Sequence, residues 1–265
     1  MDLYIFIIEM EVDMRSRWFS IIPKTLFFLC ICFVFCISIL IIIFISNKHK
    51  EDTPELPDTT QESKYENCPV VIIDAGHGGE DGGAVGIDGT LEKDLNLSIA
   101  LELDALLRAN GITTRLTRTE DILLYDRISD YQGHKKAQDM AKRLSISEEY
   151  EKAVFVSIHM NSFPQEKYKG LQVYYSVNSP NSLMLAQKIQ TLISKNLQPD
   201  NTRSIKAAGS SIYLLDRIYH PAILIECGFL SNRDDCNDLN SPSYRSNLCY
   251  IIATAICDYF QGLNT

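Results

Sequence analysis

The sequence contains no Cys-x-x-Cys pair. Eight cysteines are present, and three of them, Cys30, Cys32 and Cys36, lie in an apolar stretch near the N-terminus. The other five do not have the spacing of a thiolate zinc knuckle, and an odd number of cysteines cannot all pair within the chain. We therefore expect buried free thiols. A disulfide between Cys227 and Cys236 is the alternative.

Basic residues are fewer than acidic ones. The chain has 25 Lys and Arg against 34 Asp and Glu, and removing the first 50 residues leaves 20 basic and 30 acidic residues. No nucleic acid is expected as a partner, because neutralising phosphates needs the opposite balance of charge. The glycine-rich segment around His77 lacks both the Lys-Ser/Thr ending of a P-loop and the dinucleotide glycine spacing, so a phosphate-binding loop is disfavoured.

Residues 26–45 form an apolar stretch without a charged residue. About 20 such residues cross a bilayer as a helix, whereas the apolar part of a cleavable signal peptide has roughly 7 to 15 and precedes small residues. Phe44-Ile-Ser-Asn47 offers no such cleavage site. Three basic residues precede the stretch and two follow it, which favours a cytoplasmic segment 1–25. We expect a transmembrane anchor at 26–45, with the catalytic domain on the extracytoplasmic side.

A polar segment follows the apolar stretch. Residues 46–67 are acidic, contain two prolines and have almost no large apolar side chains, so they are expected to form a flexible linker. From Cys68 to Thr265, strand-like and helix-like segments alternate. This alternation predicts a single α/β domain with a largely parallel, twisted sheet covered by helices on both faces. Strands are expected at 70–74, 113–117, 153–159, 170–177, 212–215 and 222–226, and helices from 95 to a stop at 110, at 130–144, at 181–197 and at 243–260.

Three of these strands lead into residues that can bind or serve a metal. Val70-Val-Ile-Ile-Asp74 runs into the glycine-flanked His77, another strand ends in His159, and a third ends in Glu226. The carboxyl ends of parallel strands share one edge of a sheet, where active sites are built. Glu92, just before a helix, could reach the same edge. Two imidazoles and a carboxylate leave one zinc position open, which indicates metal-assisted hydrolysis.

Each of these residues also has a simpler interpretation. A histidine at a strand end is often only hydrogen-bonded, and Glu92 could be a solvated acid at a helix start, where the helix dipole favours negative charge. Glu226 is flanked by apolar residues, so a carboxylate there needs a partner to offset the cost of burial. Arg118 could bind a carboxylate or remain solvated. Together the segments favour the metal site.

Five motifs resemble those of the zinc-dependent N-acetylmuramoyl-L-alanine amidases of the Amidase_3 family: 73–79, 92–96, 116–118, 156–162 and 225–232. The resemblance covers Val70 to about Phe260. It implies zinc bound by His77, Glu92 and His159, with Glu226 as the catalytic glutamate. The chain departs from the family in having Cys227 where an aliphatic residue is more common and in a longer segment between Asp130 and Glu151.

This resemblance implies hydrolysis of the amide between N-acetylmuramic acid and L-alanine in peptidoglycan. Residues 201–206 and 211–215 look like those of the subgroup that acts on spore cortex. Peptidoglycan and the membrane are the expected partners, and an activating protein is left open. A zinc carboxypeptidase acting on wall peptides or a non-catalytic wall-binding regulator are the alternatives.

Overall fold

A six-stranded sheet forms the centre of the catalytic part of the chain. The computed structural model describes residues 69–125 and 134–263, together with Ile37. The predicted cytoplasmic segment and linker lie outside these residues, as does the predicted anchor apart from Ile37. Among the described residues, no helix has both the length and the apolar character needed to cross a bilayer. The described residues from 69 onward belong to one unit.

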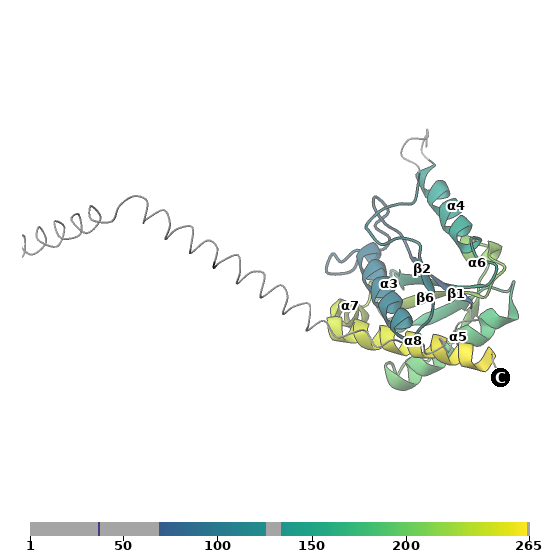
Figure 1. The fold of residues 1–265 in the computed structure, drawn as a ribbon. Coiled ribbons are helices and arrows are strands. Elements are labelled where there is room, and N and C mark those ends of the chain that lie inside the picture. Colours follow the sequence, from purple (N-terminus) through teal and green to yellow (C-terminus); the bar gives the residue numbers. More distant parts are fainter. Residues whose placement is uncertain (1–36, 38–68, 126–133, 264–265) are drawn as a thin grey trace, which may run out of the picture. The chain divides into compact units, whose positions relative to one another are not determined.

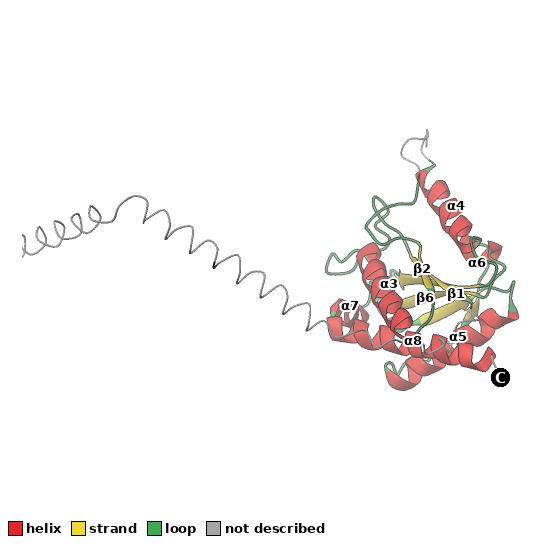
Figure 2. Cartoon of the chain, viewed as in Figure 1, coloured by secondary structure: helices red, strands yellow, loops and turns green. Residues whose placement is uncertain are grey.

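The strands run in the order β2-β1-β3-β6-β4-β5. Figure 2 shows the sheet in yellow among the helices. All neighbouring pairs are parallel except β4 and β6, which are antiparallel. The three central strands are rich in β-branched residues and almost fully buried, as expected for a sheet covered on both faces. Their bounds are β1 Val70–Ala75, β2 Thr114–Leu116, β3 Ala153–Asn161, β4 Gln172–Tyr175, β5 Lys206–Ala207 and β6 Ala222–Phe229.

Helices cover both faces of the sheet (Figure 1). On one face, α3 (Glu92–Ala109), α5 (Pro180–Asn196) and α8 (Pro242–Leu263) enclose the larger core. On the other face, α4 (Lys135–Ser147) and α6 (Tyr213–Arg217) enclose a smaller core. The helix α7 (Arg233–Asn240) contributes Cys236 and Leu239 to the larger core. The α/β class, the predominantly parallel sheet and the two helical layers are thus confirmed.

The structure corrects several predicted elements. The strand predicted at 212–215 is instead the start of α6, in which Leu214 and Leu215 pack on the sheet. Two adjacent leucines cannot both face one side of a strand, but both can contact a surface from a helical turn. The strand predicted at 170–177 is shorter and antiparallel to β6. The helix α7 was missed, although Asn232 caps it by accepting bonds from the backbone N–H groups of Asp234 and Asp235.

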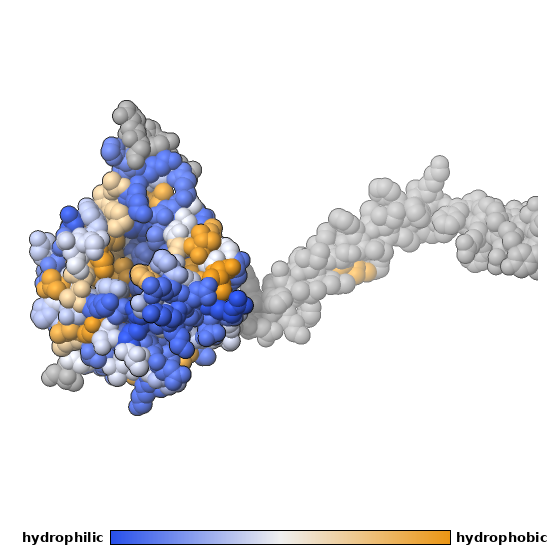
Figure 3. Space-filling model, turned by 180° about the vertical axis from the view of Figure 1, so that it is seen from behind, coloured by the Kyte–Doolittle hydropathy of each residue, from blue (hydrophilic) through white to orange (hydrophobic). Residues whose placement is uncertain are grey.

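The expected free thiols are present in the described residues. Cys227, Cys236 and Cys249 are buried and free, so the alternative pairing of Cys227 with Cys236 is wrong. The Cys236 thiol instead contacts the Asp88 carboxylate, at 3.4 Å. On the face shown in Figure 3, apolar side chains lie in separate groups among hydrophilic ones.

Candidate metal centre and active site

Glycines allow His77 and His159 to approach each other closely. Gly76 follows β1, and a Cβ atom at this position would lie 2.3 Å from ring atoms of His159. At Gly83, which has a φ of +69°, a Cβ would lie 2.5 Å from Glu92 Oε2. Only glycine avoids both contacts. His77 itself has a φ of 60°, which is uncommon for a residue with a side chain and marks local backbone strain.

The structure brings the three predicted ligands together. His77 Nε2 lies 3.2 Å from Glu92 Oε2, and His159 Nδ1 lies 2.9 Å from Glu92 Oε1. One ligand atom from each residue lies within 4.8 Å of the others. The glutamate is the first residue of α3, His77 lies in the loop after β1, and His159 lies near the end of β3. Segments that are distant in the sequence therefore supply the donor set of an open zinc site.

Backbone groups hold the Glu92 carboxylate in place. Its Oε2 accepts a bond from Ala84 N at 2.8 Å, and its Oε1 accepts one from Met160 N at 3.0 Å. Burial alone would raise the pKa of Glu92, but hydrogen bonds and charge from His159 and His77 hold that pKa well below its usual range. Glu92 is therefore a permanent anion, which suits a metal ligand.

Glu226 lies beside this cluster without belonging to it. It is the register partner of His159 across β3 and β6. Its Oε2 atom is buried and accepts no hydrogen bond from any residue that the structure describes. Burial raises the pKa of Glu226 to about 7, and the nearby negative charge of Glu92 acts in the same direction. A carboxyl group with such a pKa can accept and donate a proton near neutral pH.

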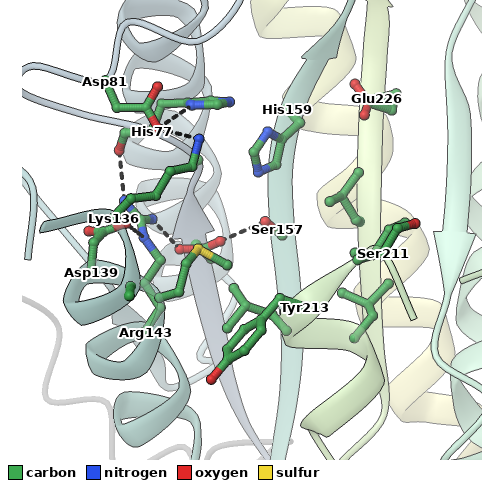
Figure 4. A pocket seen from close by; sticks show the side chains of 18 residues that line it. His77, Asp81, Lys136, Asp139, Arg143, Ser157, His159, Ser211, Tyr213 and Glu226 are labelled. Atoms are coloured by element: carbon green, nitrogen blue, oxygen red, sulfur yellow. Dashed lines mark hydrogen bonds and ion pairs between the residues drawn. The ribbon is translucent and has the colours of Figure 1, made fainter. Parts of the chain in front are cut away.

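Sequence reasoning missed Asp81 as part of the site. Asp81 Oδ2 lies 3.0 Å from His77 Nδ1 and 3.2 Å from the ammonium of Lys136 on α4 (Figure 4). Burial by itself would lower the pKa of His77, but the contacts with Glu92 and Asp81 raise it. The pair is close enough for an ion pair but does not have the geometry of a hydrogen bond, so Asp81 acts on the His77 imidazole through its charge. The available signal was the spacing of Asp81, four residues after His77 in the glycine-rich loop.

A buried ion cluster lies behind the loop of His77. Arg143 on α4 contacts Asp74 at 2.5 Å and Asp139 at 2.9 Å, and all three side chains are almost inaccessible to solvent. Arg143 also donates to the carbonyl oxygens of Ala75 and His77, at 2.7 Å each. The roles of Arg143 and Asp139 were not predicted, because their spacing shows only that they share one face of a helix.

Asp74 connects this cluster to the neighbouring strands. It accepts hydrogen bonds from Thr117 Oγ1, after β2, and from Ser157 Oγ on β3. Arg118 is buried rather than solvated, and no carboxylate of the described residues accepts a hydrogen bond from it. Its guanidinium is buried and donates to the carbonyl oxygens of Ala75, Gly76, Lys93 and Glu120. Arg118 thus connects the loop of His77 to the first turn of α3, which carries Glu92.

The site opens into a cavity of about 620 Å³. His77, His159 and Glu226 line one part of this cavity, and residues of α4 and α6 line another (Figure 4). Of the other histidines, His134 precedes α4 and His220 precedes β6, and neither belongs to the metal-binding group. His49 and Arg127 lie outside the described residues. The arrangement can bind a divalent metal next to a proton-accepting carboxyl group.

Comparisons with known proteins place the chain in an amidase family. Residues 71–258 match the Amidase_3 family, described as N-acetylmuramoyl-L-alanine amidase. The germination-specific N-acetylmuramoyl-L-alanine amidase of Bacillus subtilis is 32% identical over 191 residues, which span 72% of this chain and 79% of the relative.

Two solved structures are similar to the described part of the chain. The CwlD amidase from Clostridioides difficile, solved in complex with the GerS lipoprotein, is 36% identical with a TM-score of 0.68, covering 73% of this chain and 98% of that one. The amidase AmiC2 of Nostoc punctiforme is 34% identical with a TM-score of 0.61, and the match covers 73% of this chain and 97% of that one.

Proposed function

The chain belongs to the Amidase_3 family and hydrolyses the amide between N-acetylmuramic acid and L-alanine in peptidoglycan, and on this basis we propose a zinc-dependent mechanism with assigned residues. His77, Glu92 and His159 hold the metal. Glu226 carries the proton. The observation that supports this assignment best is the placement of Glu226 beside a compact group of three potential ligands, to which it does not itself belong.

The residues present fit zinc. Two imidazoles and one carboxylate are the donor set of catalytic zinc sites with an open position. In such a site, zinc supplies a Lewis acid for the scissile carbonyl and makes water more acidic. The buried Glu226 Oε2, which has no partner among the described residues, fits a role in receiving a proton from that water. In the metal-free protein, burial raises the pKa of Glu226 to about 7, so this carboxyl group can both gain and lose a proton near neutral pH.

In this proposal one carboxyl group acts twice. Water adds to the carbonyl carbon as Glu226 accepts its proton. Glu226 then donates that proton to the nitrogen of the leaving alanine as the C–N bond breaks. The products are a lactyl carboxylate on the sugar and a peptide with a free amino group. Asp81 lies next to His77 Nδ1 as an ion-pair partner, and Met160 N and Ala84 N orient Glu92.

We further propose that the enzyme acts on spore-cortex peptidoglycan, with the predicted segment 26–45 as its membrane anchor and the catalytic domain outside the cytoplasm. The germination-specific relative supports the choice of substrate. The relative solved with a lipoprotein supports an accessory protein as a partner. The anchor assignment depends on the sequence alone.

Digestion of purified peptidoglycan by the full chain, followed by mass spectrometry, tests the activity. Intact stem peptides and lactyl-terminated glycan are expected. Free amino acids would instead indicate a carboxypeptidase. Comparing cortex with vegetative wall as substrates tests the finer assignment, and equal rates on both would contradict it.

A further inference from the structure

Two aromatic side chains stand on the loop 162–171 that connects β3 to β4. Phe163 is 45% exposed and Tyr168 is 36% exposed, and their rings form an edge-to-face pair with centroids 5.0 Å apart. We call this pair the aromatic platform. We propose that the platform, together with a polar cavity beside it, binds the glycan strand of the substrate. This inference rests on the proposed function, because it places the sugar half of the amidase substrate.

Buried groups hold the platform in a fixed position. Tyr168 stacks on the buried ring of Phe229, with centroids 6.3 Å apart, and the Arg203 guanidinium lies over the Phe229 ring, 4.7 Å from its centroid. The backbone N–H of Phe163 donates to Ser231 Oγ at 3.0 Å. An exposed aromatic pair that is held in place before binding loses little conformational freedom when a ligand stacks on it.

The platform lies at the edge of the sheet that carries the metal centre. Its loop leaves β3 after Asn161, the second residue beyond His159, and Phe229 is the register partner of Asn161 at the end of β6. A glycan strand continues on both sides of each muramic acid, whereas the inner wall of the cavity beside the metal centre includes the core residues Leu214 and Leu215. A continuous strand therefore needs an open surface outside that cavity, which the platform provides.

Flat aromatic rings suit sugars. The faces of a pyranose ring carry apolar C–H bonds, while the hydroxyl groups point outward around its edge. Stacking such a face on an aromatic ring removes apolar surface from water and leaves the hydroxyl groups free to bond elsewhere. The side chain of Phe163 has no polar atom, so it offers only this kind of contact.

A polar cavity of about 400 Å³ adjoins the platform and can bind the hydroxyl groups. Tyr168 forms part of its wall, together with residues 197–203 and part of α7. Its lining includes charged groups of both signs: Lys167, Lys169, Arg203, Asp200, Asp234, Asp235 and Asp238. A hydroxyl group both donates and accepts hydrogen bonds. A lining of mixed charge therefore suits a neutral ligand with many hydroxyl groups better than an ion of one sign.

Binding of a peptide-free sugar tests the proposal directly. The probe is the β-1,4-linked hexamer of N-acetylglucosamine, titrated calorimetrically into the full chain. We expect the wild type to bind it and Phe163→Ser to bind it about three- to tenfold more weakly, the usual contribution of one aromatic contact. Phe163→Tyr should retain the affinity, because it keeps a flat aromatic face. No binding by the wild type, or equal affinities of the wild type and Phe163→Ser, would overturn the proposal.

Tyr219→Ser is the control for the loss of an exposed aromatic ring. Tyr219 is 82% exposed and precedes β6, so it lies at the opposite edge of the sheet. This substitution should leave the affinity for the hexamer unchanged. Thermal unfolding of Phe163→Ser should match the wild type, because the backbone bond to Ser231 is kept. An equal loss of affinity in Phe163→Ser and Tyr219→Ser would overturn the assignment to the platform.

Cleavage kinetics separate sugar binding from the reaction itself. On glycan strands that carry stem peptides, Phe163→Ser should raise KM about three- to tenfold with little change in kcat. On a muramoyl peptide with a single sugar, the rise should be smaller, because fewer sugar rings reach the platform. An equal rise on both substrates would overturn the proposal. If the zinc-loaded wild type binds the hexamer but cleaves neither substrate, the proposed function fails instead, so the two failures are distinguishable.

Discussion

His159 and Glu226 are direct partners in the parallel register of β3 and β6. The imidazole and the carboxyl group therefore leave the same edge of the sheet on adjacent strands, and neither position depends on a flexible loop. A cross-strand pair holds two side chains about one strand spacing apart, roughly 4.8 Å between backbones. This relationship places the proposed proton carrier next to a proposed metal ligand at a distance that the sheet itself determines.

Metal content tests the ligand assignment. We expect one zinc per chain in the wild type and its loss in His77→Ala and His159→Ala, because each variant removes one of three donors. His134→Ala is the control, since His134 is exposed and outside the metal-binding group. Elemental analysis of the purified full-length proteins gives the readout. Full zinc content in both active-site variants would contradict the assignment.

Two identical substitutions separate the ligand from the proton carrier. Glu226→Gln should keep zinc and lose roughly 10²- to 10⁴-fold in rate, the usual contribution of general acid–base catalysis. Glu92→Gln should weaken zinc binding, because a neutral amide is a poorer ligand than a carboxylate. Zinc content and amidase rate are measured on both variants. If Glu226→Gln lost the metal and Glu92→Gln kept metal and activity, the roles would have to be exchanged.

The raised pKa of Glu226 predicts a pH effect on the stability of the metal-free protein. Burial raises this pKa from 4.5 to about 7, so between these values the folded state holds a proton that the unfolded state releases. The contribution of Glu226 to the free energy of unfolding is therefore fully present below pH 4.5 and is lost as the pH rises through about 7. Thermal unfolding in a chelator should show a smaller decline over this window for Glu226→Gln. Identical profiles would refute the effect.

The buried ion cluster should be important for stability. Arg143→Ala leaves Asp74 and Asp139 buried without their cation, which typically costs about 3 to 5 kcal/mol in the free energy of unfolding. Arg108→Ala is the control, because Arg108 is 58% exposed and paired with Asp104. It should cost about 0 to 1 kcal/mol. Denaturant unfolding measures both, and equal losses would show that the buried cluster has no special role.

Cell fractionation tests the predicted anchor. The full-length protein should remain with membranes, and its catalytic domain should be cleaved by protease added outside the producing cell's membrane. A variant lacking residues 1–45 should appear in the soluble fraction, because it lacks the about 20 apolar residues that span a bilayer. A mature wild-type protein that begins after Ser46 would reveal a cleaved signal peptide instead.

The sequence alone located the four residues proposed for catalysis and the class of fold. His159 and Glu226 end runs of apolar, largely β-branched residues, and His77 follows such a run. Short buried runs of this kind form parallel strands, whose carboxyl ends share one edge of the sheet. This local pattern is enough to predict that the three residues meet, and the position of Glu92 before a helix brought it to the same edge.

Only the tertiary structure decided which residues support these four. Arg143 and Asp74 are separated by 69 positions, and Asp81 is joined to Lys136 from another element. The tertiary structure also decided that residues 212–215 begin a helix and that β4 runs antiparallel to β6. A polar side chain has many potential partners in an unfolded chain, and packing selects among them by excluding water from some and leaving others exposed. That selection is non-local, so residue spacing could not reveal it.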